Sequence, residues 1–242
     1  YTYTVSLAAA RGYTIEDDGS YTVTSADGLM NIAELVNGGK SDINITLDKN
    51  IDLTGKDWTP IGTDYDNSYK GTFDGGGHTI TGLTFTTNDE YAGLFGWLNR
   101  AGTVKNVVME GVQITSNQIY GGSIGGVVGY SWGTIENCSV SGSVSGTVYV
   151  GGVVGAQIGG SITGCSSSAT VKGTVDVGGV AGQTNSSATL TACYATGNVT
   201  LEIDPKKNIA GGGLVGMNAG SSLLACYATG NVTSTGSSTG QV

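Results

Sequence analysis

The stretch VGGVVG at residues 150–155 decides the fold, because close variants of it return along the chain. Tetrapeptides in which two glycines bracket two apolar residues (GLFG, GVVG, GVVG, GVAG and GLVG) begin at Gly93, Gly126, Gly152, Gly179 and Gly213. Their successive starts are therefore 33, 26, 27 and 34 residues apart. Self-similarity at a period of roughly 20–50 residues is the signature of stacked repeats. Glycine at these points lets the backbone reach positive φ and lets neighbouring walls approach closely.

A second pattern follows the tetrapeptides and marks positions that should lie above one another. It reads TIENCSVSGSV, SITGCSSSATV, TLTACYATGNV and SLLACYATGNV. In this alignment the cysteines fall in one column, at Cys138, Cys165, Cys193 and Cys226. The stretch HTITGLTFTT, residues 78–87, has the same shape, and this places Phe85 in one column with Met109 and Val140.

Composition and unit length together select one repeat architecture. The chain of 242 residues contains 43 glycines, only 12% charged residues and many Thr, Ser, Val and Ile, which favours strands. A unit of 27 residues is too short for a propeller blade of about 40–45 residues. It fits one turn of a parallel β-helix, whose strands stack about 4.8 Å apart and whose crossovers are right-handed. We therefore expect an all-β fold, a single-stranded right-handed parallel β-helix (solenoid).

One helix is expected near the start of the chain, over residues 26–37. Ser25 is a suitable N-cap and Gly38 a suitable stop. One face of the helix carries apolar residues at helical spacing, namely Leu29, Ile32, Ala33 and Val36. Because an uncapped solenoid end would expose core and strand edges, we expect this helix to cover the first coil.

A β-hairpin is expected before the helix. YTIEDDGSYTV has two short strand-like runs around a turn at Asp18 and Gly19. The predicted organisation is a hairpin and helix cap over residues 1–42, followed by the β-helix over residues 43–242. The two parts would form one structural domain, as a fragment of a longer protein.

These motifs resemble a known family. GLFG, GVVG and GLVG are similar to the GLUG repeat of bacterial secreted and surface proteins, and the lead-ins NITLDKNIDLTGKDWTPIG and YKGTFDGGGHTITGLTF resemble the region that often precedes it. The resemblance covers roughly residues 22–242. It implies a right-handed parallel β-helix on an exported or surface-anchored protein, often called an adhesin. GLUG repeats also resemble segments N-terminal to the catalytic part of IgA-cleaving metallopeptidases. The resemblance carries no agreed catalytic residues.

The charge balance excludes one class of partner. The net charge is −9 and the ten Lys and Arg residues are scattered, whereas nucleic-acid binding needs clustered cations. No apolar stretch approaches the roughly 18–20 residues that cross a bilayer. We therefore expect no nucleic-acid partner and no membrane insertion by this segment.

Few residues are available for catalysis. His78 is the only histidine, so the chain cannot contain the H-E-x-x-H zinc site, and His78 is interpreted as a turn residue. Stacked cysteines would have Cβ atoms about 4.8 Å apart, beyond the usual 3.5–4.5 Å of a disulfide, so free buried thiols are expected. A polysaccharide-active enzyme, a lyase or glycosidase with an acidic groove near residues 50–110, stays open as an alternative.

The acidic stretch TDYDNS contains a candidate calcium site. Asp64, Asp66 and Asn67 would supply the oxygen ligands that Ca²⁺ prefers. The stretch lacks the spacing of the known calcium loops. A solvated loop is the alternative interpretation.

Aromatic residues in the first half of the chain are candidate ligand-binding residues. Trp97 and Trp132 follow successive tetrapeptides, in GLFGW and GVVGYSW, and are expected on one side of the solenoid with Tyr65 and Tyr130. An exposed row of aromatic rings stacks on sugars or contacts a protein partner. The alternative is that tryptophans cover the coil end or pack under the longer loops.

The sequence thus predicts a non-catalytic adhesion or binding module of a secreted or cell-surface bacterial protein. Its expected partner is a host glycan or protein surface, and a monomer is expected. Two alternatives remain: the polysaccharide-active enzyme, and a non-catalytic N-terminal segment of an IgA-protease-like peptidase. Apart from the candidate calcium site, no cofactor is indicated.

Overall fold

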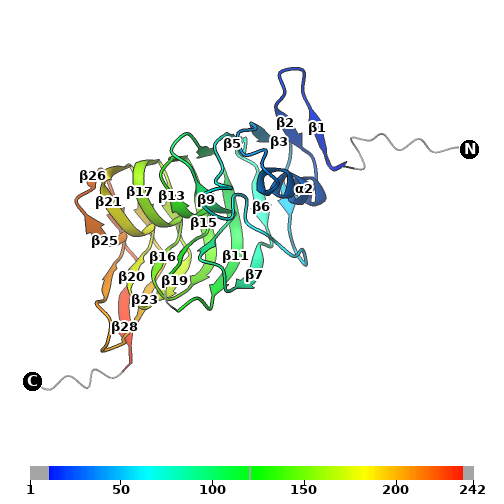
Figure 1. Ribbon diagram of the computed structural model, residues 1–242. Coiled ribbons are helices and arrows are strands. Elements are labelled where there is room, and N and C mark those ends of the chain that lie inside the picture. Colours follow the sequence, from blue (N-terminus) through cyan, green and yellow to red (C-terminus); the bar gives the residue numbers. More distant parts are fainter. Residues whose placement is uncertain (1–10, 120, 237–242) are drawn as a thin grey trace, which may run out of the picture.

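The chain forms a parallel β-solenoid of about seven turns, preceded by an antiparallel strand pair and one helix (Figure 1). The structure is a computed structural model and describes residues 11–119 and 121–236. The outer ends of the two predicted parts, residues 1–10 and 237–242, lie outside the described residues. The predicted all-β solenoid is confirmed.

Three parallel sheets make the walls of the solenoid. The first sheet contains β1 (Tyr13–Ile15), β2 (Tyr21–Val23), β3 (Ile45–Leu47), β5 (Thr72–Asp74), β9 (Phe95–Leu98), β10 (Thr103–Lys105), β13 (Val128–Ser131), β14 (Thr134–Glu136), β17 (Val154–Thr163), β21 (Ala181–Thr191), β25 (Val215–Ala219) and β26 (Ser222–Leu224). Within it only β1 and β2 pair antiparallel among the described strands.

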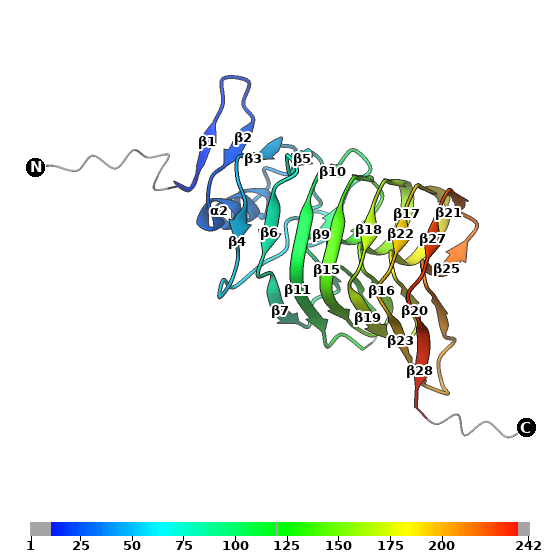
Figure 2. The same ribbon diagram turned by 180° about the vertical axis from the view of Figure 1, so that it is seen from behind.

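The second sheet lies on the face seen from behind (Figure 2). It contains β4 (Ile51–Asp52), β6 (Thr79–Thr81), β7 (Thr84–Thr87), β11 (Val108–Ser116), β15 (Ser139–Ser145), β18 (Ser166–Ser167), β19 (Thr170–Gly173), β22 (Tyr194–Ala195), β23 (Val199–Glu202), β27 (Tyr227–Ala228) and β28 (Val232–Thr235). The third sheet contains β8 (Tyr91–Ala92), β12 (Ser123–Gly125), β16 (Tyr149–Gly151), β20 (Asp176–Gly178) and β24 (Ala210–Gly212).

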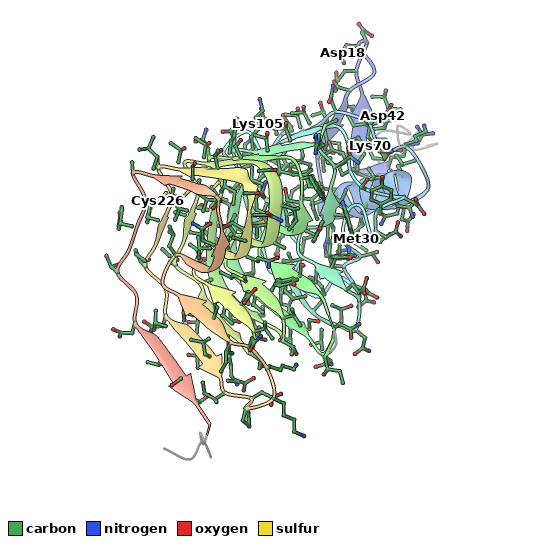
Figure 3. All side chains as sticks on the ribbon, turned by 60° about the vertical axis from the view of Figure 1, so that its left-hand side comes forward. Asp18, Met30, Asp42, Lys70, Lys105 and Cys226 are labelled. Carbon is green, nitrogen blue, oxygen red and sulfur yellow. The ribbon has the colours of Figure 1, made fainter. Side chains whose placement is uncertain are left out.

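The helix α2 (Ala26–Asn37) begins and ends where the sequence predicts. The Ser25 hydroxyl accepts a hydrogen bond from the Gly28 amide at 3.1 Å, which is N-capping geometry. Leu29, Ile32, Ala33 and Val36 are buried, so the apolar face lies on the core. The helix sits at the N-terminal end of the solenoid, with Met30 on it, while the hairpin tip at Asp18 stands away from the coils (Figure 3). Among the described residues no helix is long and apolar enough to cross a membrane.

The glycine tetrapeptides form tight corners between the third sheet and the first. Gly152 and Gly155 do not have positive φ. These glycines therefore serve the close approach of neighbouring coils and not a left-handed backbone. A Cβ at Gly155 would overlap the backbone of Ile124 on the preceding coil. A Cβ at Gly152 would overlap the Ser167 side chain and the Gly179 backbone of the next coil. The two glycines therefore let three consecutive coils touch.

The cysteine column is confirmed, with free thiols at all four positions. The Cys138 amide donates to Cys165 Sγ at 3.4 Å, and the Cys193 amide donates to Cys226 Sγ at 3.5 Å. The first three are buried, and Cys226 on the last coil is partly exposed. Figure 3 shows Cys226 at the end of the solenoid opposite the helix.

The predicted alignment of residues 78–87 with the later repeats, which put Phe85 in one column with Met109 and Val140, is wrong. Val104 pairs with Phe73, Met109 pairs with Ile80, and Phe85 pairs with Ile114. TFD on β5 therefore occupies the position in the repeat that the sequence alignment gave to TIT on β6. Phe85 belongs to the column that continues in Val144, Val171 and Val199, and the first coil is out of phase with the sequence alignment.

Candidate functional site

An aromatic cluster lies on the outside of the first and third sheets, at the level of the first and second tetrapeptide coils. Trp97 on β9 and Tyr130 on β13 are register partners, and their ring centroids are 4.2 Å apart. Tyr91 on β8 meets both rings edge-on, at 4.7 Å from Trp97 and 5.5 Å from Tyr130. Strand stacking therefore fixes three rings of the cluster.

A loop supplies the fourth ring. Isolated bridges hold its two ends, because Ile61 pairs with Phe95 and Tyr69 pairs with Leu98. Between these anchors the chain leaves the coil and carries Tyr65 to 5.8 Å from the Trp97 ring, edge-on. Tyr65 is 70% exposed. We call Tyr65, Tyr91, Trp97 and Tyr130 the aromatic cluster.

The turn under Tyr65 is set by Asp64. Its carboxylate accepts hydrogen bonds from the Asn67 amide at 3.0 Å and from the Asn67 side chain at 3.1 Å. The Thr63 hydroxyl donates to the same carboxylate at 3.1 Å. These donors, with the Asn67 amide as the largest effect, lower the pKa of Asp64. Asp64 is therefore ionised at neutral pH.

Two phenols of the cluster, those of Tyr91 and Tyr130, have a raised pKa. Burial, followed by the neighbouring Glu90, raises the pKa of Tyr91 to about 12. Burial also raises the pKa of Tyr130. At these two positions the outer face therefore presents uncharged aromatic rings whose hydroxyls remain hydrogen-bond donors.

A pocket of about 270 Å³ adjoins the aromatic cluster, and we call it the acidic pocket. Its lining residues are Pro60, Thr63, Asp64, Asp89, Glu90 and Tyr91. A second pocket, of about 280 Å³, shares Pro60 and Asp89 with it and extends toward Asp57 and Trp58. The Thr87 hydroxyl donates to Asp89 Oδ2 at 2.7 Å, which orders that carboxylate at the boundary between the two pockets.

The structure brings together three of the four predicted aromatic residues. Tyr65, Trp97 and Tyr130 belong to the cluster. Trp132 instead lies under the Arg100 guanidinium, whose Cζ is 5.3 Å from the Trp132 ring centroid. Tyr91 was not among the predicted binding residues, although its place two residues before GLFG is close to that of Tyr149, three residues before GVVG, and this would have been a signal. That these residues bind a ligand stays a prediction.

The calcium ligands also stay a prediction. The Asp64 oxygens are engaged by Asn67 and Thr63, and Asp66 is exposed. Within residues 11–119 and 121–236, no group of three His, Cys, Asp or Glu is placed to hold a metal ion.

One buried carboxyl was not anticipated. Asp176 on β20 is only 4% exposed, and burial raises its pKa to about 6. It lies in register with Tyr149 on the preceding coil. A lone Asp in the strand-like DVGG gives no signal of burial, because only the packed corner determines which side chains are covered.

Comparison with solved structures supports the fold. The chain is similar to a crystal structure described as "a putative immunoglobulin A1 protease from Bacteroides ovatus", with a TM-score of 0.72 and 22% identity over 94% of this chain and 82% of that one. At this identity the likeness concerns the fold alone.

Two curated relatives match about half of the chain. Halomucin of Haloquadratum walsbyi is 38% identical over 120 residues, which is 46% of this chain and 1% of that protein. A "Putative Gly-rich membrane protein" of Evansella cellulosilytica is 33% identical over 129 residues, 50% of this chain and 14% of that protein. The chain thus spans a small part of the length of both relatives.

The model of the GLUG motif matches two adjacent segments. They contain β12 to β15 and β16 to β19, and each begins shortly before a glycine corner and ends on the second sheet. The repeated unit of sequence is therefore the repeated coil of the structure, and the chain carries the GLUG motif at residues 120–145 and 146–172.

Proposed function

We propose that this chain is a non-catalytic binding module of an exported or cell-surface protein, and that it holds a carbohydrate on the aromatic cluster. The observation that carries the proposal is the meeting of four rings on one outer face. The centroids of the contacting ring pairs are between 4.2 and 5.8 Å apart. Tyr65, which completes the cluster, is 70% exposed.

The chemistry of the rings suits a sugar. Aromatic rings present a large apolar surface with a negative face, and the C–H groups of a pyranose are its apolar, weakly positive side. The tyrosine hydroxyls provide acceptors and donors for sugar hydroxyls. Three of the rings stand on strands, so their positions are fixed before a ligand arrives, which reduces the entropy lost on binding.

The carboxyl groups favour binding over hydrolysis at this place. A glycosidase needs a protonated acid with a raised pKa within about 5–10 Å of a second carboxylate. Hydrogen bonds instead lower the pKa of Asp64. Asp176, whose pKa is raised, lies on β20, which is three strands from β8 in the third sheet and so about 14 Å away at the usual strand spacing.

A glycan array followed by calorimetric titration of the best ligand tests the proposal. Tyr65→Ala is expected to weaken binding at least about tenfold, because base- and ring-stacking aromatics contribute roughly 1–3 kcal/mol each. The matched control is Tyr227→Ala, since Tyr227 is also exposed, at 55%, and stacked on Tyr194 at 5.2 Å on the second sheet. Equal losses in both variants, or an array without a ligand, would contradict the proposal.

The surface location has its own test. Antibody against this chain should label intact cells of the source organism, and brief protease treatment of those cells should remove the signal. Labelling only after permeabilisation would contradict the proposed location while leaving the binding test unaffected.

A further inference from the structure

The acidic pocket beside the aromatic cluster has a consistent charge. Asp64, Asp89 and Glu90 line it together with the Tyr91 ring. Asp57 adds a further carboxyl to the neighbouring pocket that shares Asp89. Among the residues that line these two pockets there is no Lys or Arg.

No cation of the described residues forms an ion pair with the acidic pocket. The ion pairs found within residues 11–119 and 121–236 are Lys56–Asp27 at 2.7 Å, Lys105–Asp74 at 3.2 Å and Lys172–Glu202 at 2.7 Å. None of them includes a carboxylate of the acidic pocket. The pocket carboxylates are therefore not neutralised by a salt bridge within the described part of the chain.

Hydrogen bonds order two of the pocket carboxylates. Asp64 is held by Asn67 and Thr63, which lower its pKa. Asp89 is fixed by the Thr87 hydroxyl, and its own amide donates to that hydroxyl at 3.0 Å. Each carboxylate keeps lone pairs for a further donor, because an ionised carboxylate has about four acceptor sites.

We propose that the aromatic cluster and the acidic pocket together select a sugar that carries a protonated amine, and disfavour sugars with carboxylate or sulfate groups. This inference rests on the proposed carbohydrate binding at the aromatic cluster. The rings supply the stacking surface for any sugar. The carboxylates of Asp89 and Glu90 then decide which substituent is favoured at its edge, since an ammonium group satisfies their free lone pairs with charge-assisted hydrogen bonds.

The size of the effect follows from Coulomb's law. An ammonium about 4–5 Å from a carboxylate gains from about fourfold in affinity in bulk water to several hundredfold at the effective dielectric of about 20 near a protein surface. For a partly open pocket we expect about a tenfold preference over the neutral sugar at low salt. The Debye length is about 10 Å at 0.1 M salt and becomes shorter at higher salt concentrations. The preference for the amine should therefore decrease as the salt concentration rises.

Calorimetry with the intact chain and two tetramers of the same linkage, one of glucosamine and one of glucose, tests the inference. At pH 6 and about 50 mM salt the glucosamine tetramer is expected to bind about tenfold more tightly, and at about 500 mM salt the difference should fall to about twofold. A tetramer of galacturonic acid is expected to bind more weakly than either of them.

Variants locate the preference. Asp89→Asn combined with Glu90→Gln should remove the preference for the amine while glucose tetramer binding is retained, and this retention also shows that the variant is folded. The control is Glu110→Gln, which removes an exposed carboxylate on β11 in the second sheet.

The outcomes separate the two proposals. Equal affinities for glucose and glucosamine tetramers, with both lost in Tyr65→Ala, would overturn the charge selection and leave the carbohydrate-binding function standing. A preference that persists in the Asp89/Glu90 variant would also overturn the inference. Binding that is unaffected by Tyr65→Ala would overturn the proposed site itself.

Discussion

Trp97 and Tyr130 occupy the same register position on successive coils, and their rings are 4.2 Å apart on the outer face of the solenoid. Parallel stacking of strands thus turns a spacing in the sequence into a contact between rings. The next partners in this column are Ala156 and Gln183, so the aromatic cluster ends where the side chains change.

Removing the central ring should affect binding and stability together. Trp97→Ala is expected to abolish carbohydrate binding and to lower the free energy of unfolding by about 2–3 kcal/mol, less than for a fully buried tryptophan because Trp97 is partly exposed. Chemical denaturation and calorimetry measure the two effects. Trp132→Ala is the control, because Trp132 contacts Arg100 instead of the cluster. A Trp132 variant that loses binding as Trp97→Ala does would contradict the site.

The glycine corners make a steric prediction. Gly155→Ala should lower the free energy of unfolding by about 2–4 kcal/mol, because its Cβ would overlap the Ile124 backbone. Gly77→Ala is the comparison, since nothing lies within 4 Å of a Cβ there and φ is +77°. That variant should cost only the roughly 1 kcal/mol of left-handed backbone. Urea unfolding curves of both variants decide the matter, and equal losses would show that coil contact is not the cause.

Asp176 should make stability depend on pH. Its pKa is raised from 3.8 to about 6 by burial, so the folded state favours the neutral acid. The resulting penalty is absent below about pH 4, grows between pH 4 and pH 6, and is complete above that window. The wild type should therefore lose up to about 3 kcal/mol relative to Asp176→Asn as pH rises from 4 to 7.5. Parallel stability curves of the two proteins over this range would contradict the burial of a titrating carboxyl.

The cysteine column predicts graded reactivity. Burial raises the pKa of Cys193 to about 12, and the adjoining Cys138, together with burial, raises that of Cys165. Since the thiolate is the reactive form, iodoacetamide at pH 8 should modify the partly exposed Cys226 first. The other three should react only after denaturation. Mass spectrometry follows the modification, and early labelling of Cys138 would contradict the packing of the column.

The parts of the fold that depend on local patterns could be predicted. The helix carries its own cap at Ser25 and its own apolar face, and the cysteine column follows from a motif that keeps the same length in each coil. The phase of residues 78–87 could not be obtained in this way. TIT on β6 and TFD on β5 have similar alternation, and only the pairing of Val104 with Phe73 distinguishes them.

The candidate site was predictable only in part for a related reason. Tyr65 reaches Trp97 through a loop anchored at Ile61 and Tyr69. The sequence does not show the path of this loop, so the contact between the two rings could not be derived from it. Trp132 follows its tetrapeptide two residues later than Trp97 does, as GVVGYSW against GLFGW. Because of that offset, Trp132 lies under Arg100, and Tyr130 is the register partner of Trp97.

The first and last described coils differ in burial, and amide exchange of residues 11–236, tested as this chain, should therefore be graded along the solenoid axis. At the first end α2 covers the coil, and Leu29 and Val36 are fully buried. On the last described coil Leu223 is 41% and Leu224 66% exposed, and each coil contacts mainly its neighbours. Local opening should then begin at β26 and travel coil by coil toward the helix, so that deuterium enters residues 210–235 long before it enters the strands beside α2.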